Sequence, residues 1–235
     1  MKIAAIADLH CRASSAGTIR PLLEGVEREA DVLVLAGDLT DTGLPDEIKV
    51  LESELAGLDL PIVCVLGNHD HESDKADALT EMLCDLGINV LNGTVCEIGG
   101  VGFVGTKGFC GGFDNLFVQP FGERALKTFI QSSIDEAVNL ENALTKLDCP
   151  HKVAILHYAP VKATLQGEPL ELYPFLGSSR LANALDRHGV DIIVHGHAHH
   201  GSLEAHTPGG IPVHNVCRFV RTRHGQSPYC LLEVA

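Results

Sequence analysis

The chain has 235 residues and a formal net charge of -14 at pH 7. With 45% hydrophobic and 20% charged residues, its composition is that of a globular enzyme and excludes disordered, collagen-like and coiled-coil proteins. The acidic balance disfavours non-specific nucleic-acid binding, which depends on neutralising phosphates with lysine and arginine.

The sequence shows no sign of a membrane-spanning segment or of disulfide bonds. No apolar run approaches the ~18 residues that cross a bilayer, so we expect no membrane partner. Only five apolar residues precede Asp8, whereas the apolar segment of a signal peptide needs roughly seven or more. The eight cysteines include no C-x-x-C pair, and a chain of this length does not need disulfides for stability. We therefore expect free thiols and a cytoplasmic location.

The first third of the chain alternates between apolar runs and amphipathic segments. Each apolar run has the length of a buried strand, and each amphipathic segment repeats its apolar residues at helical spacing. Strands that are apolar throughout and alternate with helices predict a parallel sheet covered on both faces. The predicted strands are 2–8, 31–36 and 61–66, and the predicted helices are 14–26, 45–58 and 74–86.

The pattern changes after the third predicted helix. Asn92-Gly93 and Gly99-Gly100 predict hairpin turns, and the short segments 94–98 and 101–105 predict antiparallel strands that join the sheet. A glycine-rich loop follows at 107–114.

A long helix is predicted next, because apolar residues recur at helical spacing at Leu126, Ile130, Ile134, Val138 and Leu144. After it we expect two strands separated by a short helix, and then a tail of three or four short strands. The helices are 122–147 and 180–188, the strands 152–157 and 190–195, and the tail 202–234. No repeat or low-complexity stretch marks a boundary, so we expect a single domain over residues 1–235.

Polar clusters follow five of the predicted strands. Asp8, Asp38 and Asn68 are thirty residues apart, one strand and helix each, so they reach the same edge of the sheet. His157 and the pair His197 and His199 follow two later strands. Taken singly, such residues are common turn formers and helix caps. Together they bring carboxylates, an amide and imidazoles to one edge, as a divalent-metal site requires.

Five motifs occur in a fixed order: D-x-H at 8–10, G-D-x-x-D at 37–41, G-N-H-D at 67–70, a single histidine at 157, and G-H-x-H at 196–199. Together they resemble the calcineurin-like metallophosphoesterase family over residues 3 to about 216. The resemblance implies an α/β fold, specifically a four-layer αββα sandwich with mixed sheets.

The resemblance also implies two divalent metal ions. The implied ligands of the first ion are Asp8, His10, Asp38 and His199, and those of the second are Asp38, Asn68, His157 and His197, with Asp38 shared. His69 matches the family's catalytic histidine, which is not a ligand, and Asp41 matches the acid that orients it.

These residues predict a metal-dependent phosphoric ester hydrolase that acts on a small phosphorylated substrate. Two cations lower the pKa of the water between them, so a bridging hydroxide can attack phosphorus, while His69 protonates the leaving oxygen. Carboxylate, amide and imidazole ligands favour Mn, Fe or Zn over Ca. Thr42 and His71 stand where the family's phosphoprotein phosphatases carry arginine, which favours a phosphodiesterase.

Three other functions stay open at this stage. A phosphomonoesterase or pyrophosphohydrolase would use the same residues. A non-catalytic metal-binding scaffold would be expected to have lost ligands, and none is missing here. A metal hydrolase that acts on amide or lactam bonds is disfavoured by the Asn68-His69 pair.

Two weaker signals concern the substrate. Ser178, Ser179 and Arg180 enter a short predicted helix and could bind a second phosphate or a leaving group. An ordinary serine cap with a solvated arginine explains them equally well. The segments 107–114 and 164–176 are either lids over the site or plain surface loops.

Overall fold

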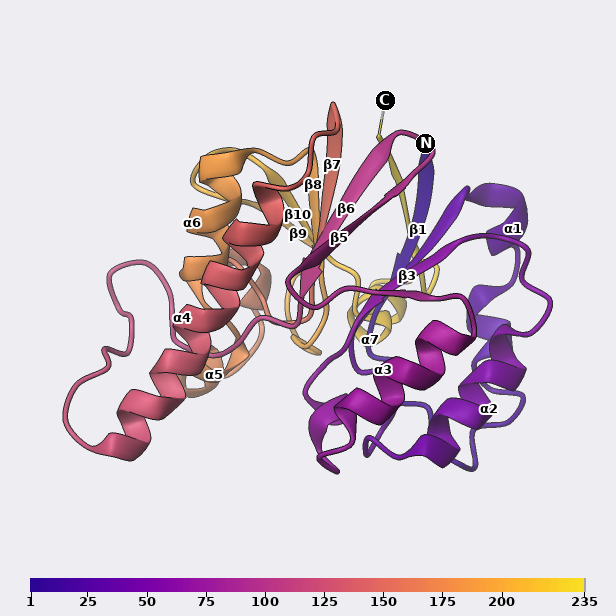
Figure 1. Cartoon of the computed structure of the whole chain (residues 1–235), viewed down its shortest axis with the longest axis horizontal. Coiled ribbons are helices and arrows are strands. Elements are labelled where there is room, and N and C mark those ends of the chain that lie inside the picture. Colours follow the sequence, from indigo (N-terminus) through magenta and orange to yellow (C-terminus); the bar gives the residue numbers. More distant parts are fainter. Residues whose placement is uncertain (235) are drawn as a thin grey trace.

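The computed structural model describes residues 1–234 as two β-sheets packed face to face, with helices on both outer faces (Figure 1). The first sheet has the order β11-β1-β2-β3-β4, and within it β11 alone runs antiparallel to its neighbour. Its strands are β1 (Lys2–Ile6), β2 (Val32–Ala36), β3 (Ile62–Val65), β4 (Asn89–Val90) and β11 (Cys230–Glu233). The three predicted apolar strands form the parallel centre of this sheet.

The second sheet is also mixed. Its order is β5-β6-β7-β8-β10-β9, with four parallel central strands and an antiparallel strand at each edge. The strands are β5 (Thr94–Ile98), β6 (Val101–Thr106), β7 (His151–Leu156), β8 (Ile192–His195), β9 (Glu204–His206) and β10 (Pro212–Asn215).

Helices α1 to α3 lie outside the first sheet, and α4 and α6 lie outside the second (Figure 1). The helices are α1 (Val26–Glu29), α2 (Pro45–Leu55), α3 (Ala76–Asp85), α4 (Arg124–Leu144), α5 (Tyr173–Leu176), α6 (Ser179–His188) and α7 (Arg218–Arg223). Short 3₁₀ turns occupy Arg20–Leu23, His69–His71, Lys162–Leu165 and Leu170–Leu172. The predicted four-layer αββα sandwich with mixed sheets is confirmed. No helix within residues 1–234 is both long and apolar enough to cross a membrane.

The central core lies between the two sheets. It contains buried side chains from strands of both sheets, including Val34, Val63, Phe103, Ile155 and Val194. Separate apolar cores fill the space between each sheet and its helices. Because the central strands are buried on both faces, their sequences are continuous apolar runs.

Segment 14–26 does not form the single predicted helix. It forms a 3₁₀ turn and the one-turn helix α1, separated by Gly25, whose φ of 88° a right-handed helix cannot include. The buried carboxylate of Glu54 in α2 accepts hydrogen bonds from three backbone N–H groups between residues 17 and 20, at 2.6 to 2.8 Å. A tertiary contact therefore sets the conformation of this segment.

Asn92-Gly93 is not a hairpin turn. Strand β4 pairs with β3 of the first sheet and β5 pairs with β6 of the second, so the chain passes between the sheets at this point. The two strands that follow therefore begin the second sheet and do not extend the first. Gly99-Gly100 does join β5 and β6 as predicted. The tail contains the helix α7 in addition to its strands.

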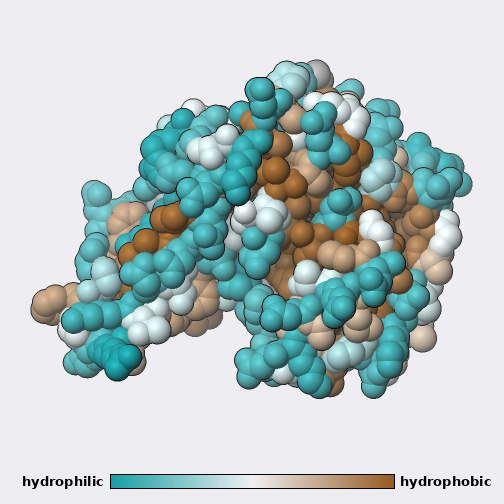
Figure 2. Space-filling model, viewed as in Figure 1, coloured by the Kyte–Doolittle hydropathy of each residue, from teal (hydrophilic) through white to brown (hydrophobic). Residues whose placement is uncertain are grey.

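Helix α4 extends beyond the sheet that it covers. Its buried stripe passes through Ile130, Ser133 and Leu140. Two of the apolar residues that predicted this helix lie beside that stripe, with Leu126 36% and Val138 46% exposed. The N-terminal part of α4 and the loop before it form a protruding arm (Figure 1). Figure 2 shows that the molecule is hollowed between this arm and the part that carries α2 and α3.

Candidate metal centre

The predicted site residues lie where strands of both sheets end. Strands β1, β2 and β3 of the first sheet and β7 and β8 of the second each end just before one or two of them. Atoms from positions as far apart as 191 residues come within hydrogen-bond distance. The structure brings together all seven predicted ligands, namely Asp8, His10, Asp38, Asn68, His157, His197 and His199.

Asp8, His10, Asp38 and His199 form the first cluster. One ligand atom from each lies within 4.8 Å of the other three, so a single ion can contact all four. His199 Nε2 lies 3.1 Å from Asp8 Oδ1, and His10 Nε2 lies 3.8 Å from Asp38 Oδ2. Both carboxylates are buried, so bulk water does not screen their charges.

Asp38, His157 and His197 form the second cluster, again with ligand atoms within 4.8 Å of one another. His157 Nε2 lies 3.3 Å from Asp38 Oδ1 and 2.9 Å from Asn68 Oδ1, so the predicted amide ligand also reaches this cluster. The two oxygens of Asp38 thus face different clusters, with Oδ2 toward His10 and Oδ1 toward His157.

The donor atoms fit divalent cations. His10 Nε2 is buried and has no hydrogen-bond partner among the described residues. A buried polar atom without a partner is costly, and a cation in the first cluster would provide that partner. Carboxylate, amide and imidazole donors without a thiolate suit ions such as Mn, Fe and Zn.

The charges within the clusters compensate one another. Burial alone would raise the pKa of Asp8, but the hydrogen bond from His199 and the charges of nearby histidines hold that pKa below its usual range. Burial also opposes a charge on His157, yet the charge and hydrogen bond of Asp38 raise its pKa to about 9. Burial lowers the pKa of His197 to about 3. At neutral pH His197 is ready to bind a cation, whereas His157 must first lose a proton.

Four of the candidate ligands have a left-handed backbone. Their φ angles are 60° at Asp8, 47° at His10, 50° at Asp38 and 67° at His197. Aspartate and histidine adopt this region more readily than most residues, but it still costs roughly 1–2 kcal/mol each. Hydrogen bonds of 3.0 Å from the N–H of Asp8 to the Gly37 carbonyl, and from that of His10 to the Asp38 carbonyl, offset part of this cost.

Three motif glycines leave room for ligands from neighbouring strands. A Cβ at Gly37 would lie 2.4 Å from His157 Nδ1, and one at Gly67 would lie 2.1 Å from Asp38 Oδ1. A Cβ at Gly196 would lie 2.7 Å from an Asp8 carboxylate oxygen. All three distances are shorter than real contacts of a Cβ atom, so each glycine allows a ligand of another strand to approach its backbone.

His69 lies beside the first cluster, with its ring centroid 4.5 Å from that of His10. Its Nδ1 donates a hydrogen bond of 2.6 Å to the backbone carbonyl of Asp41. The Asp41 carboxylate instead pairs with Arg12 Nε at 2.8 Å and lies 3.4 Å from His10 Nδ1. Asp41 therefore holds His69 through its main chain, because Arg12 and His10 occupy its side chain.

Asp70, the last residue of the G-N-H-D motif, has a supporting position that the sequence did not suggest. Its fully buried carboxylate accepts hydrogen bonds from the backbone N–H groups of Leu39, Thr40 and Gly67, at 2.7 to 3.2 Å. The Thr40 hydroxyl donates a further bond of 2.6 Å. Asp70 therefore ties together the loops that carry Asp38 and Asn68.

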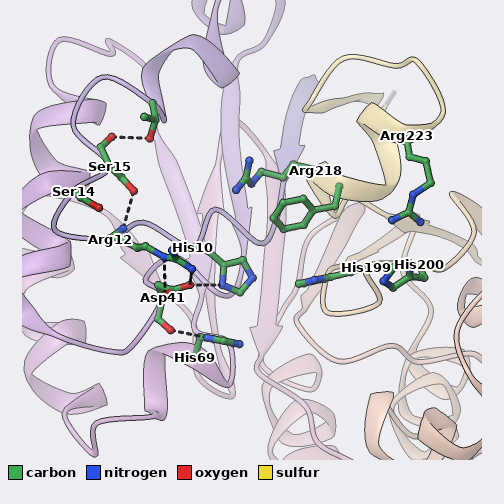
Figure 3. A pocket seen from close by; sticks show the side chains of 12 residues that line it. His10, Arg12, Ser14, Ser15, Asp41, His69, His199, His200, Arg218 and Arg223 are labelled. Atoms are coloured by element: carbon green, nitrogen blue, oxygen red, sulfur yellow. Dashed lines mark hydrogen bonds and ion pairs between the residues drawn. The ribbon is translucent and has the colours of Figure 1, made fainter.

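A pocket of about 790 Å³ opens over the first cluster (Figure 3). His10, His69 and His199 line one part of it, and the rest is lined by further residues of the loop after β1, by helix α7, and by Asp41 and His200. Its volume is typical of a small-molecule site.

Comparison with known proteins places these residues in a family. The family model of calcineurin-like phosphoesterases matches residues 1–201, which is most of the chain. The chain belongs to this family. A segment of 70 residues is also 30% identical to the glycerophosphodiester phosphodiesterase GpdQ of Enterobacter lignolyticus (strain SCF1). That match covers 30% of this chain and 25% of the relative, so it spans a quarter of that enzyme's length.

Solved structures share the fold. The phosphopantetheinyl hydrolase PptH of Mycobacterium tuberculosis superposes with a TM-score of 0.72 at 17% identity, over 100% of this chain and 96% of that one. A putative 5'-nucleotidase of Staphylococcus aureus, in complex with alpha-ketoglutarate, superposes with a TM-score of 0.53 at 14% identity. This second match covers 91% of this chain and 48% of the other.

In this calcineurin-like phosphoesterase the three predicted substrate-binding residues lie away from the pocket over the first cluster. Ser178 Oγ accepts the N–H of Arg180 at 3.3 Å, at the start of α6. Ser179 Oγ accepts the N–H of Asp114 at 3.0 Å, and the Arg180 guanidinium lies 4.6 Å from the Phe117 ring. These contacts favour the interpretation of the serines as cap and loop residues.

The two candidate lid segments are bonded to each other near the second cluster. The N–H of Gly111 donates to the Pro174 carbonyl at 2.7 Å, and the Phe175 carbonyl accepts from His197 Nε2 at 3.4 Å. Segment 164–176 therefore contacts a candidate ligand, and its action as a lid stays a prediction.

Helix α7 adds two residues that no motif indicated. Arg218 Nε donates to the Asp8 carbonyl at 2.8 Å, and the Phe219 ring lies 4.9 Å from the His199 ring.

Proposed function

We propose that this phosphoesterase uses two divalent metal ions to hydrolyse small phosphate esters, with phosphodiesters as its preferred substrates. The observation that carries the proposal is the position of Asp38, whose two oxygens face His10 and His157 in different clusters. A shared carboxylate can hold two ions about 3.5 to 4 Å apart. The first ion would bind Asp8, His10, Asp38 and His199, and the second Asp38, Asn68, His157 and His197.

The bound ions would supply a nucleophile from water at neutral pH and neutralise charge on the phosphate oxygens. His69 would act on the leaving group. Its Nδ1 is engaged with the Asp41 carbonyl, so Nε2 of the imidazolium form is left to donate a proton to the leaving oxygen. Asp41 would position this ring and also hold Arg12 in the pocket wall.

Two observations support phosphodiesters. The partial relative is named as a phosphodiesterase. In addition, the Thr42 hydroxyl donates a hydrogen bond to Glu47 at 2.9 Å. Position 42 therefore holds a neutral side chain that is already hydrogen-bonded, whereas an arginine there would favour a phosphomonoester, which carries more negative charge than a diester. A phosphomonoesterase or pyrophosphohydrolase with the same ligands is the alternative. A non-catalytic scaffold is disfavoured because every ligand position is filled.

We further propose Mn, Fe or Zn as the ions and the cytoplasm as the compartment. The nitrogen and oxygen donors support the choice of metals. All eight cysteines are free, which suits a reducing compartment.

The proposal is tested by hydrolysis of bis-p-nitrophenyl phosphate and p-nitrophenyl phosphate, with metal-free protein and with protein reloaded with Mn. We expect turnover only after reloading, and faster turnover of the diester. His69→Ala should lower kcat by about 100-fold or more, the usual contribution of a general acid. His151→Ala, at the start of β7 and far from the strand ends that carry the site, is the matched control and should keep wild-type activity.

Asp41→Asn separates the two roles of that residue. Because the backbone carbonyl holds His69, this variant should lose less than about tenfold in kcat, well below the loss in His69→Ala. Turnover that does not need metal, or equal losses in His69→Ala and His151→Ala, would overturn the proposal.

A further inference from the structure

Two arginines of α7 line the pocket without a carboxylate partner. The pocket lining contains three arginines, Arg12, Arg218 and Arg223, and one carboxylate, Asp41. Arg12 is bound to that carboxylate through two hydrogen bonds of 2.8 and 3.4 Å. Within residues 1–234, neither Arg218 nor Arg223 forms an ion pair with an acidic side chain. In a chain with 31 acidic and 17 basic residues, two uncompensated arginines in one pocket indicate an anionic ligand.

The two arginines stand at different places in the pocket: Arg218 lies on the side of His10, and Arg223 lies across the pocket from His69 (Figure 3). The rings of His10, His199 and Phe219 form a triangle, with centroids 5.3 Å (His10 to His199), 4.9 Å (His199 to Phe219) and 6.0 Å (His10 to Phe219) apart. His69 lies 4.5 Å from His10, and the guanidinium carbon of Arg218 lies 4.2 Å from the Phe219 ring centroid. Figure 3 shows His69 and Arg223 on opposite sides of the pocket.

Arg218 is held in place before any ligand binds. Its Nε donates to the Asp8 carbonyl and its plane lies against Phe219, so the terminal nitrogens of the guanidinium are left for a ligand. Arg223 is exposed on the same helix and extends toward the pocket (Figure 3). The planar fork of an arginine matches the oxygens of a phosphate, and a positioned fork loses little entropy on binding.

We propose that Arg223 binds a second phosphate group of the substrate, in a pocket whose positive charge Arg218 increases. This inference rests on the proposed function and narrows it to phosphodiesters that carry a further phosphate. Because His69 serves the leaving group on the opposite side of the pocket from Arg223, the second phosphate belongs to the part of the substrate that stays bonded to phosphorus. In the reaction, the water oxygen forms a bond to phosphorus and releases its proton to the solvent, the bond between phosphorus and the leaving oxygen breaks, and the leaving oxygen takes a proton from His69.

A matched pair of chromogenic substrates tests this assignment. The p-nitrophenyl ester of thymidine 5'-phosphate and the same ester with an added 3'-phosphate share their leaving group and differ only in the second phosphate. With the Mn-loaded protein, we expect kcat/KM to be about tenfold or more higher for the 3'-phosphorylated ester. This is the gain expected when an arginine forms two charge-assisted hydrogen bonds with a phosphate. Arg223→Ala should bring the ratio of the two values close to one. Arg124→Ala, which removes an exposed arginine from α4, is the charge-matched control and should keep the ratio.

Binding to the metal-free protein gives a second readout that does not depend on turnover. In calorimetric titrations, thymidine 3',5'-bisphosphate should bind the wild type and Arg124→Ala equally, and Arg223→Ala about tenfold more weakly. Turnover of both esters with no preference for the second phosphate, or a preference that survives in Arg223→Ala, would overturn the inference and leave the proposed function intact. If neither ester is hydrolysed, the proposed function fails. Equal binding of the bisphosphate by the wild type, Arg124→Ala and Arg223→Ala would overturn the inference as well.

Discussion

Gly67→Ala should separate metal binding from folding. A Cβ at this position would lie 2.1 Å from Asp38 Oδ1 and 2.3 Å from the Asp38 backbone nitrogen, and contacts of real Cβ atoms stay above 3.0 Å. Asp38 must therefore retreat by about 1 Å, because a packed interior leaves no other space. Even the loss of an outer partner of a ligand lowers metal affinity by about 10 to 100-fold. Since Asp38 is shared by both clusters, we expect a loss of about 100-fold or more.

Gly57→Ala is the control for stability. Gly57 has a φ of 79° and no atom within 4 Å of a built Cβ, so alanine there costs roughly 1–2 kcal/mol of backbone strain and touches no ligand. Overpacking at position 67 should cost about 1–3 kcal/mol. Urea unfolding measures both costs, and titration with Mn followed by elemental analysis measures the affinity. If Gly67→Ala binds two ions as tightly as Gly57→Ala does, the shared position of Asp38 does not control metal binding and the steric argument is refuted.

Two further predictions concern pH and stability. Burial opposes the charge of His157, but Asp38 raises the pKa of His157 to about 9, above the ordinary 6.5. The ion pair of His157 and Asp38 therefore stabilises the metal-free protein fully below pH ~6.5, and this stabilisation is lost as the pH rises through 9. Urea unfolding of the metal-free protein at several pH values checks this, and a His157→Gln variant should lack that part of the decline. Because the metal must displace the same proton, the rise in Tm on adding metal should grow with pH from 7 to 9 and should not stay constant. Glu54→Gln removes the charge of the carboxylate that accepts hydrogen bonds from three backbone N–H groups, and it should lower the free energy of unfolding by about 2–4 kcal/mol. Glu52→Gln, at an exposed position of the same helix, should leave the free energy of unfolding almost unchanged. Equal urea midpoints for the two variants would contradict this prediction.

The strand ends of the site are predictable because local pattern and chemistry agree there. An apolar run marks each central strand, and the polar residue that follows it marks the end. The topology of parallel strands then brings Asp8, Asp38 and Asn68 to one edge without any further information. The left-handed backbone at Asp8, Asp38 and His197 follows from the same position, since the chain must turn as soon as the strand ends.

Other features depend on contacts that no local pattern reveals. The passage between the sheets at Asn92-Gly93 looks like a hairpin turn, because the pairing partners of β4 and β5 are set by distant strands. Helix α7 has only six residues, too few to be stable alone, so its formation depends on packing beside the site. The sequence likewise does not reveal that the Asp41 carboxylate contacts Arg12 and His10, two residues of another loop, and not the His69 ring.

The separation of the ligands along the chain has a consequence for synthesis of the protein. A ribosome makes Asp8 191 residues before its partner His199. Neither candidate ion site can be completed on a nascent chain that has not yet emerged as far as the end of β8. Products that end prematurely would therefore carry no intact site, and metal acquisition would follow folding of nearly the whole chain.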